Sequence, residues 1–360
     1  MKRILVCGAG GSPSTNFVRS LRAMDESVFL VGVDADPFML ERAETDVKIL
    51  VPRASEADYL PILNDIITEY KIGFVHAQND SEIAFLSEHR NEIHANLFLP
   101  RKETINICMD KFQSYESWEK AGIRVPKTKL ITSEDDLKQA FKDFGSQLWL
   151  RNITGAAGNG SYPTSDYDEA VQWIHFQKGW GTFTAAERLT EHTVTWMSIW
   201  HNGELIVAQG RKRLYWELGN RAPSGVTGVT GAGMTYSDSA MDDIAVRTIK
   251  AIDPMPHGIF SVDMTYDRNG APNPTEINIG RFFTTHYFFT KAGLNMPEIF
   301  VRLAYGETPV VPEKRIGPLP DGLVWVRGVD FEPVLTTIDN VEKSKHALEE
   351  RRTKYVAKEK

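Results

Sequence analysis

The sequence contains only two cysteines among its 360 residues, Cys7 and Cys108, and they stand far apart. Two distant cysteines favour a reducing compartment over a disulfide framework, and they exclude a four-cysteine zinc site. No apolar run reaches the length of about 18 residues that a membrane-spanning helix needs. The first residues also lack the apolar core and cleavage site of a secretory signal. We therefore expect a cytoplasmic protein that does not cross a membrane.

Positive charge is also scarce, since 41 Lys and Arg residues face 48 Asp and Glu residues and give a formal net charge of −7. This balance argues against nucleic acid or an anionic membrane as the main partner. A nucleotide substrate would need cations concentrated at one site. The length predicts two or three domains, and a chain of this size can bury a core without disulfides.

The first hundred residues alternate short apolar strands with amphipathic helices. This alternation predicts a parallel sheet with helices on both faces. The expected strands are residues 4–7, 29–33, 49–51, 73–77 and 96–99, and the expected helices are 14–22, 59–70 and 81–89.

Further along, two helices over 103–122 precede a strand, a helix capped by Ser133, and a strand over 148–151. From residue 182 the pattern changes to antiparallel strands, with hairpin turns expected at 202–203 and 267–270. Residues 219–233 are polar and rich in glycine, which predicts a mobile loop. The charged segment 340–360 predicts a solvated tail. The sequence thus predicts an α/β region followed by α+β regions.

The first glycine cluster, around Gly10 and Gly11, follows a strand and precedes a helix that contains Ser14. A dinucleotide fingerprint has this position, and Asp34 would be its ribose-binding acid. The third glycine of that fingerprint is replaced by Pro13. Two hypotheses remain open here: an NAD(P)-dependent oxidoreductase, or a tight turn that binds another anion at the helix N-terminus.

The second glycine cluster follows a cation, Arg151, at the end of a strand. Small residues let backbone amides approach phosphate oxygens closely, and a loop built from them can close over a ligand. Arg151 would add a fixed fork of donors. The cluster lacks the Gly-Lys-Ser/Thr ending of a P-loop, so an ordinary surface loop is the alternative. Its members are Gly155, Ala156, Gly158, Gly160 and Ser161.

Three polar residues interrupt apolar strands near the end of the predicted antiparallel region. Glu276 and Asn278 are two positions apart and face the same side of one strand, and Asp263 lies on the preceding strand. Two carboxylates and an amide oxygen suit Mg²⁺, which prefers oxygen ligands and bridges phosphates. Arg281 follows closely and could stabilise charge on a transferred phosphoryl group. The alternative is a solvated hairpin face.

Several other polar residues are weaker candidates. Lys111 precedes a helix, and such a lone lysine is usually solvated. Asp80 and Glu82 follow a strand of the first region, where open α/β sheets bind ligands, or they cap the next helix. His286 lies among aromatic residues that form either an acceptor pocket or core.

The order of these features resembles the ATP-grasp superfamily, in particular proteins similar to the large subunit of carbamoyl phosphate synthase. The resemblance covers roughly residues 1–310, and the Asp263…Glu276-Ile277-Asn278 run is its most specific part. It implies a Rossmann-like N-terminal domain over 1–105 and a two-subdomain ATP-grasp fold over 106–310. The subdomains would be 106–185 and 186–310, and the role of 311–360 is unclear.

The resemblance also implies roles for individual residues. ATP would lie between the two subdomains, with Lys111 and Arg151 on its phosphates and the second glycine cluster closing over them. Asp263, Glu276 and Asn278 would hold Mg²⁺, or Mn²⁺ in its place, and Arg281 would face an acyl phosphate. The adenine and ribose would contact the linker residues Glu187, Arg188 and Leu189, with Glu191, His192 or Thr193 at the ribose.

We therefore expect an ATP- and Mg²⁺-dependent ligase that activates a carboxylate as an acyl phosphate and transfers it to an amine or a thiol. The N-terminal residues Gly10, Gly11, Ser14, Asp80 and Glu82, with His286, would contact substrate. The partners would be small molecules, and the resemblance allows a homodimer. An NAD(P)-dependent oxidoreductase, a non-catalytic ATP-binding sensor and a kinase remain alternatives.

Overall fold

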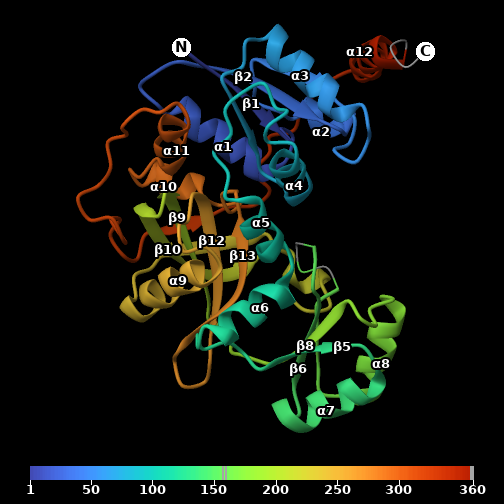
Figure 1. Cartoon of the computed structure of the whole chain (residues 1–360), viewed down its shortest axis with the longest axis vertical. Coiled ribbons are helices and arrows are strands. Elements are labelled where there is room, and N and C mark those ends of the chain that lie inside the picture. The colour runs from blue at the N-terminus through green and yellow to red at the C-terminus, as the bar shows by residue number, and fades with distance from the viewer. Residues whose placement is uncertain (156–157, 159, 357–360) are drawn as a thin grey trace.

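The computed structural model describes residues 1–155, 158 and 160–356, of which residue 356 is described by its backbone alone. The described residues form three sheets, and Figure 1 shows the N-terminal sheet at the top, a six-stranded sheet in the middle and a second four-stranded sheet at the bottom. No helix in this described part of the chain is long and apolar enough to span a bilayer.

The N-terminal sheet is parallel, as the sequence predicts, with the strand order β3-β2-β1-β4. Alternate residues of β1 enter two different cores: Ile4 and Val6 pack with α1, whereas Leu5 and Cys7 pack with α3 and α4. The strands are β1 Lys2–Cys7, β2 Val28–Asp34, β3 Val47–Leu50 and β4 Phe74–Ala77, and the helices are α1 Ser12–Arg22, α2 Pro37–Glu41, α3 Tyr59–Glu69 and α4 Asp80–Glu88.

Two details of this region differ from the prediction. The strand expected over 96–99 is reduced to one isolated bridge between Asn96 and Phe74, because Phe98 and Leu99 are buried by packing rather than by ladder pairing. The short helix α2 was missed, and it begins where the Asp36 side chain accepts hydrogen bonds from the amides of Phe38 and Met39.

The second four-stranded sheet is antiparallel, with the order β5-β8-β6-β7, and its core is made with α7 and α8. The predicted Ser133 cap is confirmed, since its hydroxyl accepts from the amide of Asp136 at 3.3 Å. The elements from the preceding helices onward are α5 Lys102–Met109, α6 Lys111–Lys120, β5 Thr128–Ile131, α7 Glu134–Phe144, β6 Leu148–Asn152, β7 Tyr162–Thr164, α8 Tyr167–Phe176 and β8 Phe183–Glu187.

The six-stranded sheet has the order β13-β12-β9-β10-β11-β14, and every neighbouring pair in it is antiparallel. The predicted turn at 202–203 is confirmed, with Asn202 and Gly203 both in the left-handed region at φ 51° and 89°. Its strands are β9 Thr193–His201, β10 Glu204–Trp216, β11 Thr230–Thr235, β12 Gly258–Tyr266, β13 Pro272–Ile279 and β14 Val324–Val326, and the helices are α9 Ser239–Ile252, α10 Tyr287–Lys291 and α11 Met296–Ala304.

The prediction of a loop over 219–233 is wrong at its end, because β11 begins at Thr230. Gly231 and Gly233 belong to this strand. A Cβ on Gly231 would lie 2.0 Å from the Tyr215 ring, and one on Gly233 would lie 2.8 Å from the Arg211 side chain. The absence of side chains at these two glycines therefore leaves room for Tyr215 and Arg211 to lie across the strand. The glycines do not indicate a loop here.

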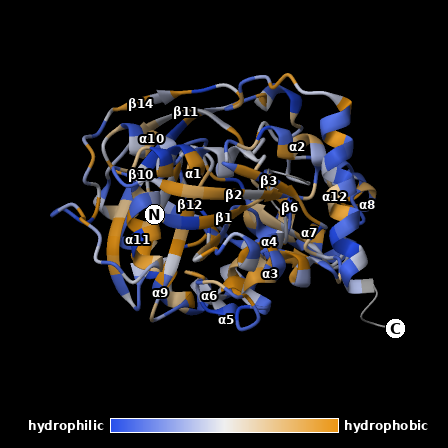
Figure 2. Ribbon diagram, turned by 90° about the horizontal axis from the view of Figure 1, so that it is seen from above, coloured by the Kyte–Doolittle hydropathy of each residue, from blue (hydrophilic) through white to orange (hydrophobic). Residues whose placement is uncertain are grey.

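The C-terminal segment is not a solvated tail, because it returns to the N-terminal domain. Helix α12, Ile338–Val356, lies against α2, α3 and β3, and Figure 2 shows it as a largely hydrophilic helix beside them. Val341 and Leu348, seven positions apart on one face, are buried. Arg351 and Arg352 add ion pairs to Glu69 and Glu56 at 2.8 and 2.7 Å. Because charged residues surround Val341 and Leu348 in the sequence, the pattern did not predict a packed helix.

Candidate active site

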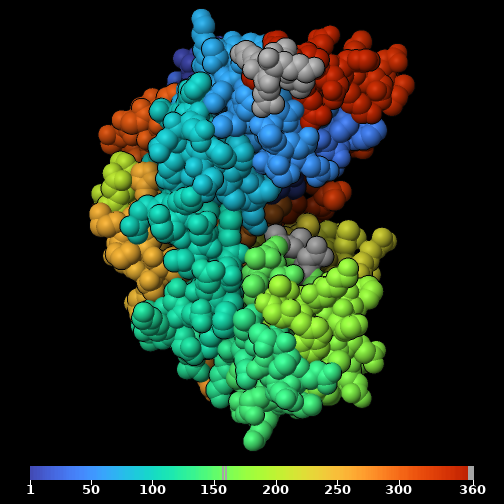
Figure 3. Space-filling view, turned by 45° about the vertical axis from the view of Figure 1, so that its right-hand side comes forward, coloured from blue at the N-terminus to red at the C-terminus, as the bar shows by residue number. Residues whose placement is uncertain are grey.

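A cleft of about 780 Å³ lies between the four-stranded antiparallel sheet and the six-stranded sheet. Figure 3 shows the surface indented between the N-terminal domain and the domain of the antiparallel four-stranded sheet. Residues predicted from distant stretches of the sequence meet in this cleft. Those that line it are Lys111, Arg151, Gly155, Gly158, Ser161, Glu187, Arg188, Leu189, Thr193, Asp263, Glu276, Asn278 and Arg281.

The three predicted metal ligands lie together on the hairpin of β12 and β13. Asp263 pairs with Glu276 across the strands, and the Asn278 amide donates to the Asp263 carboxylate at 3.0 Å. Burial raises the pKa of Asp263, and the neighbouring Glu276 charge raises it further, whereas Arg213 lowers it. Two adjacent carboxylates with an amide oxygen form an oxygen-rich group that a divalent cation would stabilise.

Two cations face this group from the other side of the cleft. The Lys111 ammonium lies 3.7 Å and the Arg151 guanidinium 3.8 Å from the Glu276 carboxylate. Lys111 also donates to the Gly155 carbonyl at 2.6 Å, and Arg151 donates to the Thr275 carbonyl at 2.7 Å. Lys111 reaches this position because Asp110 caps α6 and fixes the start of that helix. The lone lysine of the sequence is therefore a cleft residue.

Arg281 connects the metal candidates with the N-terminal domain. Its guanidinium donates to the Asn278 side-chain oxygen at 2.6 Å and to the Asp80 carboxylate at 2.7 Å. Gly280, with φ 71°, turns the chain directly before it. This left-handed residue brings Arg281 back beside Asn278.

The second glycine cluster borders the same cleft. Gly155, Gly158 and Gly160 have φ values of 91°, 68° and 74°, which side chains rarely adopt. A Cβ on Gly158 would lie 2.5 Å from the Val226 carbonyl, so this loop contacts the loop before β11. Ala156 lies outside the described residues, and Gly160 is not among the residues that line the cleft.

The predicted adenine and ribose residues lie at the outer end of the cleft. The Glu187 carboxylate accepts from the Lys127 amide at 3.2 Å, and Arg188 is exposed. Of the three ribose candidates, Glu191 and Thr193 line the cleft. His192 instead stacks on Tyr266, with ring centroids 4.1 Å apart.

The N-terminal glycine turn has its polar groups engaged within the chain. The Gly10 amide donates to the Asp34 carboxylate at 3.0 Å, and the Gly11 amide donates to the Gly8 carbonyl at 3.0 Å. A Cβ on Gly10 would lie 2.0 Å from the Met39 carbonyl. The turn therefore uses its glycines for packing, and Asp34 accepts from its backbone.

The remaining predicted substrate residues are not brought into the cleft. The Ser14 hydroxyl donates to the Cys7 carbonyl at 3.2 Å, and Glu82 accepts from the Tyr59 hydroxyl at 3.2 Å. Burial raises the pKa of Glu82 to about 7. His286 is fully buried, with Nδ1 2.8 Å from the Phe283 carbonyl, and burial lowers its pKa to about 4.

Sequence reasoning missed two arginines on β10. Arg211 and Arg213 line the inner part of the cleft and share one strand face, as positions i and i+2 must. Arg213 donates to the Thr193 hydroxyl at 2.8 Å and lies 4.0 Å from Asp263. The sequence does contain a signal for them, because two arginines spaced two apart follow an apolar run in the same strand.

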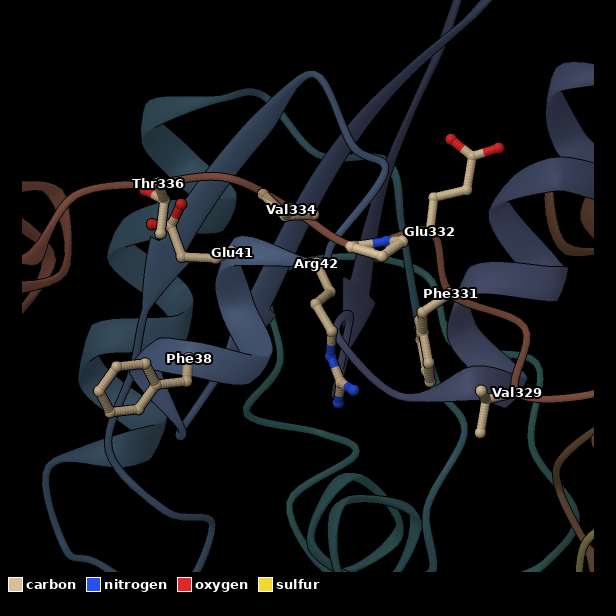
Figure 4. Close-up of a pocket in the computed structure, with 9 residues that line it drawn as sticks. Phe38, Glu41, Arg42, Val329, Phe331, Glu332, Val334 and Thr336 are labelled. Carbon is tan, nitrogen blue, oxygen red and sulfur yellow. The ribbon is translucent and has the colours of Figure 1, made fainter.

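A second cavity, of about 440 Å³, lies outside this site. Figure 4 shows it between α2 and residues 329–336, with the Arg42 guanidinium 4.1 Å from the Phe331 ring centroid. It forms where the C-terminal segment crosses the N-terminal domain.

No family model matches the sequence. Solved structures match it closely in three dimensions, and one is the biotin carboxylase domain dimer of Hydrogenobacter thermophilus 2-oxoglutarate carboxylase with MgADP, ADP and bicarbonate. The TM-score is 0.68 at 14% identity, over 90% of this chain and 73% of that one.

Two further matches are similar in extent. N5-carboxyaminoimidazole synthase from Aspergillus clavatus, in complex with ADP and 5-aminoimidazole ribonucleotide, gives a TM-score of 0.66 at 15% identity, over 88% of this chain and 79% of that one. L-Amino acid ligase from Bacillus licheniformis gives 0.64 at 12% identity, over 84% and 74%. The chain therefore has the fold of these proteins, and the α/β and α+β fold class predicted from the sequence is confirmed.

Proposed function

We propose that this protein is an ATP- and Mg²⁺-dependent ligase that activates a carboxylate as an acyl phosphate and transfers it to an amine or a thiol. One observation carries the proposal: Lys111 and Arg151 converge on Glu276 beside Asp263 and Asn278, in a cleft between two antiparallel sheets. Solved proteins of the same fold were determined with ATP, ADP or MgADP. The domains would be residues 1–105, 106–310 and 311–360.

The residues present fit a magnesium ion. Asp263 and Glu276 provide two carboxylates from facing positions of one hairpin, and Asn278, two residues along from Glu276, provides an amide oxygen. The described residues contain no group of three or more His, Cys, Asp or Glu side chains that could hold a metal, so the amide is needed to complete the set. When bound, the ion would neutralise phosphate charge.

Residues of the chain would bind the phosphates, stabilise the transferred group and exclude water. Lys111 and Arg151 would hold the phosphates, and Arg281 would stabilise charge as the phosphoryl group moves to the carboxylate oxygen. Asp80 positions Arg281 through their 2.7 Å contact. The two loops that meet at Gly158 and Val226 would exclude water, which would otherwise hydrolyse the acyl phosphate.

The alternative functions have less support. An NAD(P)-dependent oxidoreductase would need free amides at the N-terminal turn, but those of Gly10 and Gly11 bond within the chain. A non-catalytic sensor would not need Arg281 beside the metal candidates. A kinase would use the same residues and differ only in its product. The neighbours' bicarbonate, aminoimidazole ribonucleotide and amino acid chemistry indicates small-molecule partners, and a homodimer remains a prediction.

Trapping the intermediate tests this function and separates the ligase from a kinase. The purified protein would be incubated with Mg²⁺-ATP, hydroxylamine and a panel of small carboxylic acids and amino acids. A ligase is expected to form a hydroxamate together with ADP and phosphate, because hydroxylamine intercepts the acyl phosphate. Phosphorylation of a hydroxyl group, with no hydroxamate from any acid that stimulates ATP turnover, would support the kinase.

A further inference from the structure

Arg211 lines the cleft, and within the described part of the chain its guanidinium donates hydrogen bonds only to neutral groups. It donates to the hydroxyls of Thr195, Thr230 and Thr285 at 2.7, 2.8 and 3.1 Å. Its guanidinium carbon lies 4.7 Å from the Phe283 ring centroid. The residue is only 2% exposed, yet it lines the cleft.

This arginine differs from the other cations nearby. Arg151, Arg213 and Arg281 each have a carboxylate within 4.0 Å, at Glu276, Asp263 and Asp80 respectively. Among the described residues, Arg211 has no such partner, and its buried Nε has no hydrogen-bond acceptor. Burial, together with the neighbouring Arg213 charge, lowers the pKa of Arg211 to about 9, although the charge of Asp263, on the far side of Thr195, opposes this in part. A buried charge with no carboxylate in direct contact is costly, which indicates that an anion completes the site.

The position of Arg211 indicates which anion this is. The Thr195 hydroxyl accepts from Arg211 and donates to Asp263, so a single side chain separates Arg211 from the metal candidates. The cations assigned to the phosphates, Lys111 and Arg151, contact Glu276 instead. The Thr195, Thr230 and Thr285 hydroxyls and the turn at Ser12 and Pro13 also line the cleft, so polar groups accompany Arg211 there.

We propose that Arg211 binds the carboxylate of the acid substrate and places it beside the phosphoryl group, which makes β10 a specificity-determining strand. The inference rests on the proposed ligase function. The planar guanidinium suits a carboxylate, which accepts two parallel hydrogen bonds. The substrate class is therefore a small carboxylic acid.

Thermal unfolding with a minimal probe tests this assignment. Acetate and its neutral analogue acetamide would be compared, each with saturating MgADP and at constant ionic strength. Acetate is expected to raise the unfolding temperature of the wild type more than acetamide does. Arg211→Met is expected to lose this acetate-specific increase while keeping the increase that MgADP causes.

Two variants serve as controls for folding and charge. Arg211→Lys keeps the charge and is expected to retain part of the acetate-specific increase. If Arg211→Met does not fold, a reduced acetate-specific increase in Arg211→Lys still tests the assignment. Arg247→Met removes an exposed arginine on α9, a helix that contributes none of the residues lining the cleft, and is expected to behave as the wild type.

An acetate-specific increase that persists in Arg211→Met, or that is absent from the wild type, would overturn the assignment. If MgADP did not raise the unfolding temperature of the wild type, the proposed function itself would be overturned.

Discussion

The two glycine clusters look alike in the sequence, since each follows a strand, but they serve opposite purposes in the fold. At the N-terminal turn, the Gly10 amide bonds to Asp34, and Gly10 itself packs against the Met39 carbonyl. In the second cluster, Gly155 and Gly158 line the cleft beside Lys111. The comparison teaches that a glycine cluster indicates a ligand site only when its amides remain available, and this depends on residues far along the chain.

The largest expected effect comes from Arg281, which lines the same cleft as the second glycine cluster. Arg281→Met should lower kcat by about 10²–10³-fold while leaving MgADP affinity nearly unchanged, because the guanidinium would act on charge that develops in the transition state. Steady-state kinetics with the acid found by hydroxamate trapping would measure this. Asp80 only positions Arg281, so Asp80→Asn should lower kcat less than Arg281→Met does. An equal loss of kcat in the two variants would contradict a direct role of Arg281 in the transition state.

A large pH effect is expected from Glu82, which lies beneath the N-terminal turn. Because its folded pKa of about 7 is above its ordinary value of 4.5, the folded state holds a proton that the unfolded state has lost. Its contribution is therefore greatest below pH 4.5 and declines by about 3 kcal/mol as the pH rises to about 7.

Glu82→Gln should remove that decline, and urea unfolding of both proteins across this pH range would measure it. The difference between the two curves isolates Glu82 from the buried residues His76 and His286, whose lowered pKa values act in the opposite direction. A difference between the curves that does not change with pH would contradict the assignment.

Alanine substitutions separate the two glycine clusters directly. Gly10→Ala should destabilise the fold by about 1–3 kcal/mol through its clash with the Met39 carbonyl, with little change in nucleotide affinity of the folded protein. Gly158→Ala should destabilise the fold by a similar amount, because its φ is 68° and a Cβ would lie 2.5 Å from the Val226 carbonyl, and it should also weaken MgATP binding.

Gly270→Ala is the matched control for Gly158, because it has a similar φ of 77° and open space around its Cβ position. Chemical denaturation and nucleotide titration of the three variants would measure these effects. If Gly10→Ala weakened nucleotide binding and Gly158→Ala left it unchanged, the roles of the two clusters would be reversed.

The smallest expected effect lies at the surface of α12. Removing the ion pair of Arg351 with Glu69 by Arg351→Gln should reduce stability by about 0.2–1 kcal/mol, because exposed ion pairs are weak and are screened by salt. The loss should fade at high ionic strength. A salt-independent loss would indicate that packing, rather than charge, holds α12 in place.

The sequence predicted most of the regular structure because local patterns determine it. The apolar runs of β1 and β2 and the Asn202-Gly203 turn are examples. The predicted set of Asp263, Glu276 and Asn278 does lie together, since strand periodicity and a hairpin turn bring them there.

Features that depend on distant contacts were not predicted. Gly231 is a strand residue because β11 pairs with β10 and β14, and α12 is held by its contacts with α2, α3 and β3 rather than by its own pattern. Arg211 and Arg213 were missed because only the folded sheet places them beside Asp263. Conversely, Glu82 and His286 looked available in the sequence but are buried in the fold.

The most direct test of the account is thermal unfolding with and without Mg²⁺-ATP, performed on the wild type and on a Glu276→Ala, Asn278→Ala double variant. A ligand at a hundredfold excess over its Kd stabilises a folded protein by about 2.7 kcal/mol. The account predicts a clear increase in unfolding temperature for the wild type and none for the double variant. An increase with NADH or NADPH in place of Mg²⁺-ATP would contradict it and assign the nucleotide to the N-terminal turn.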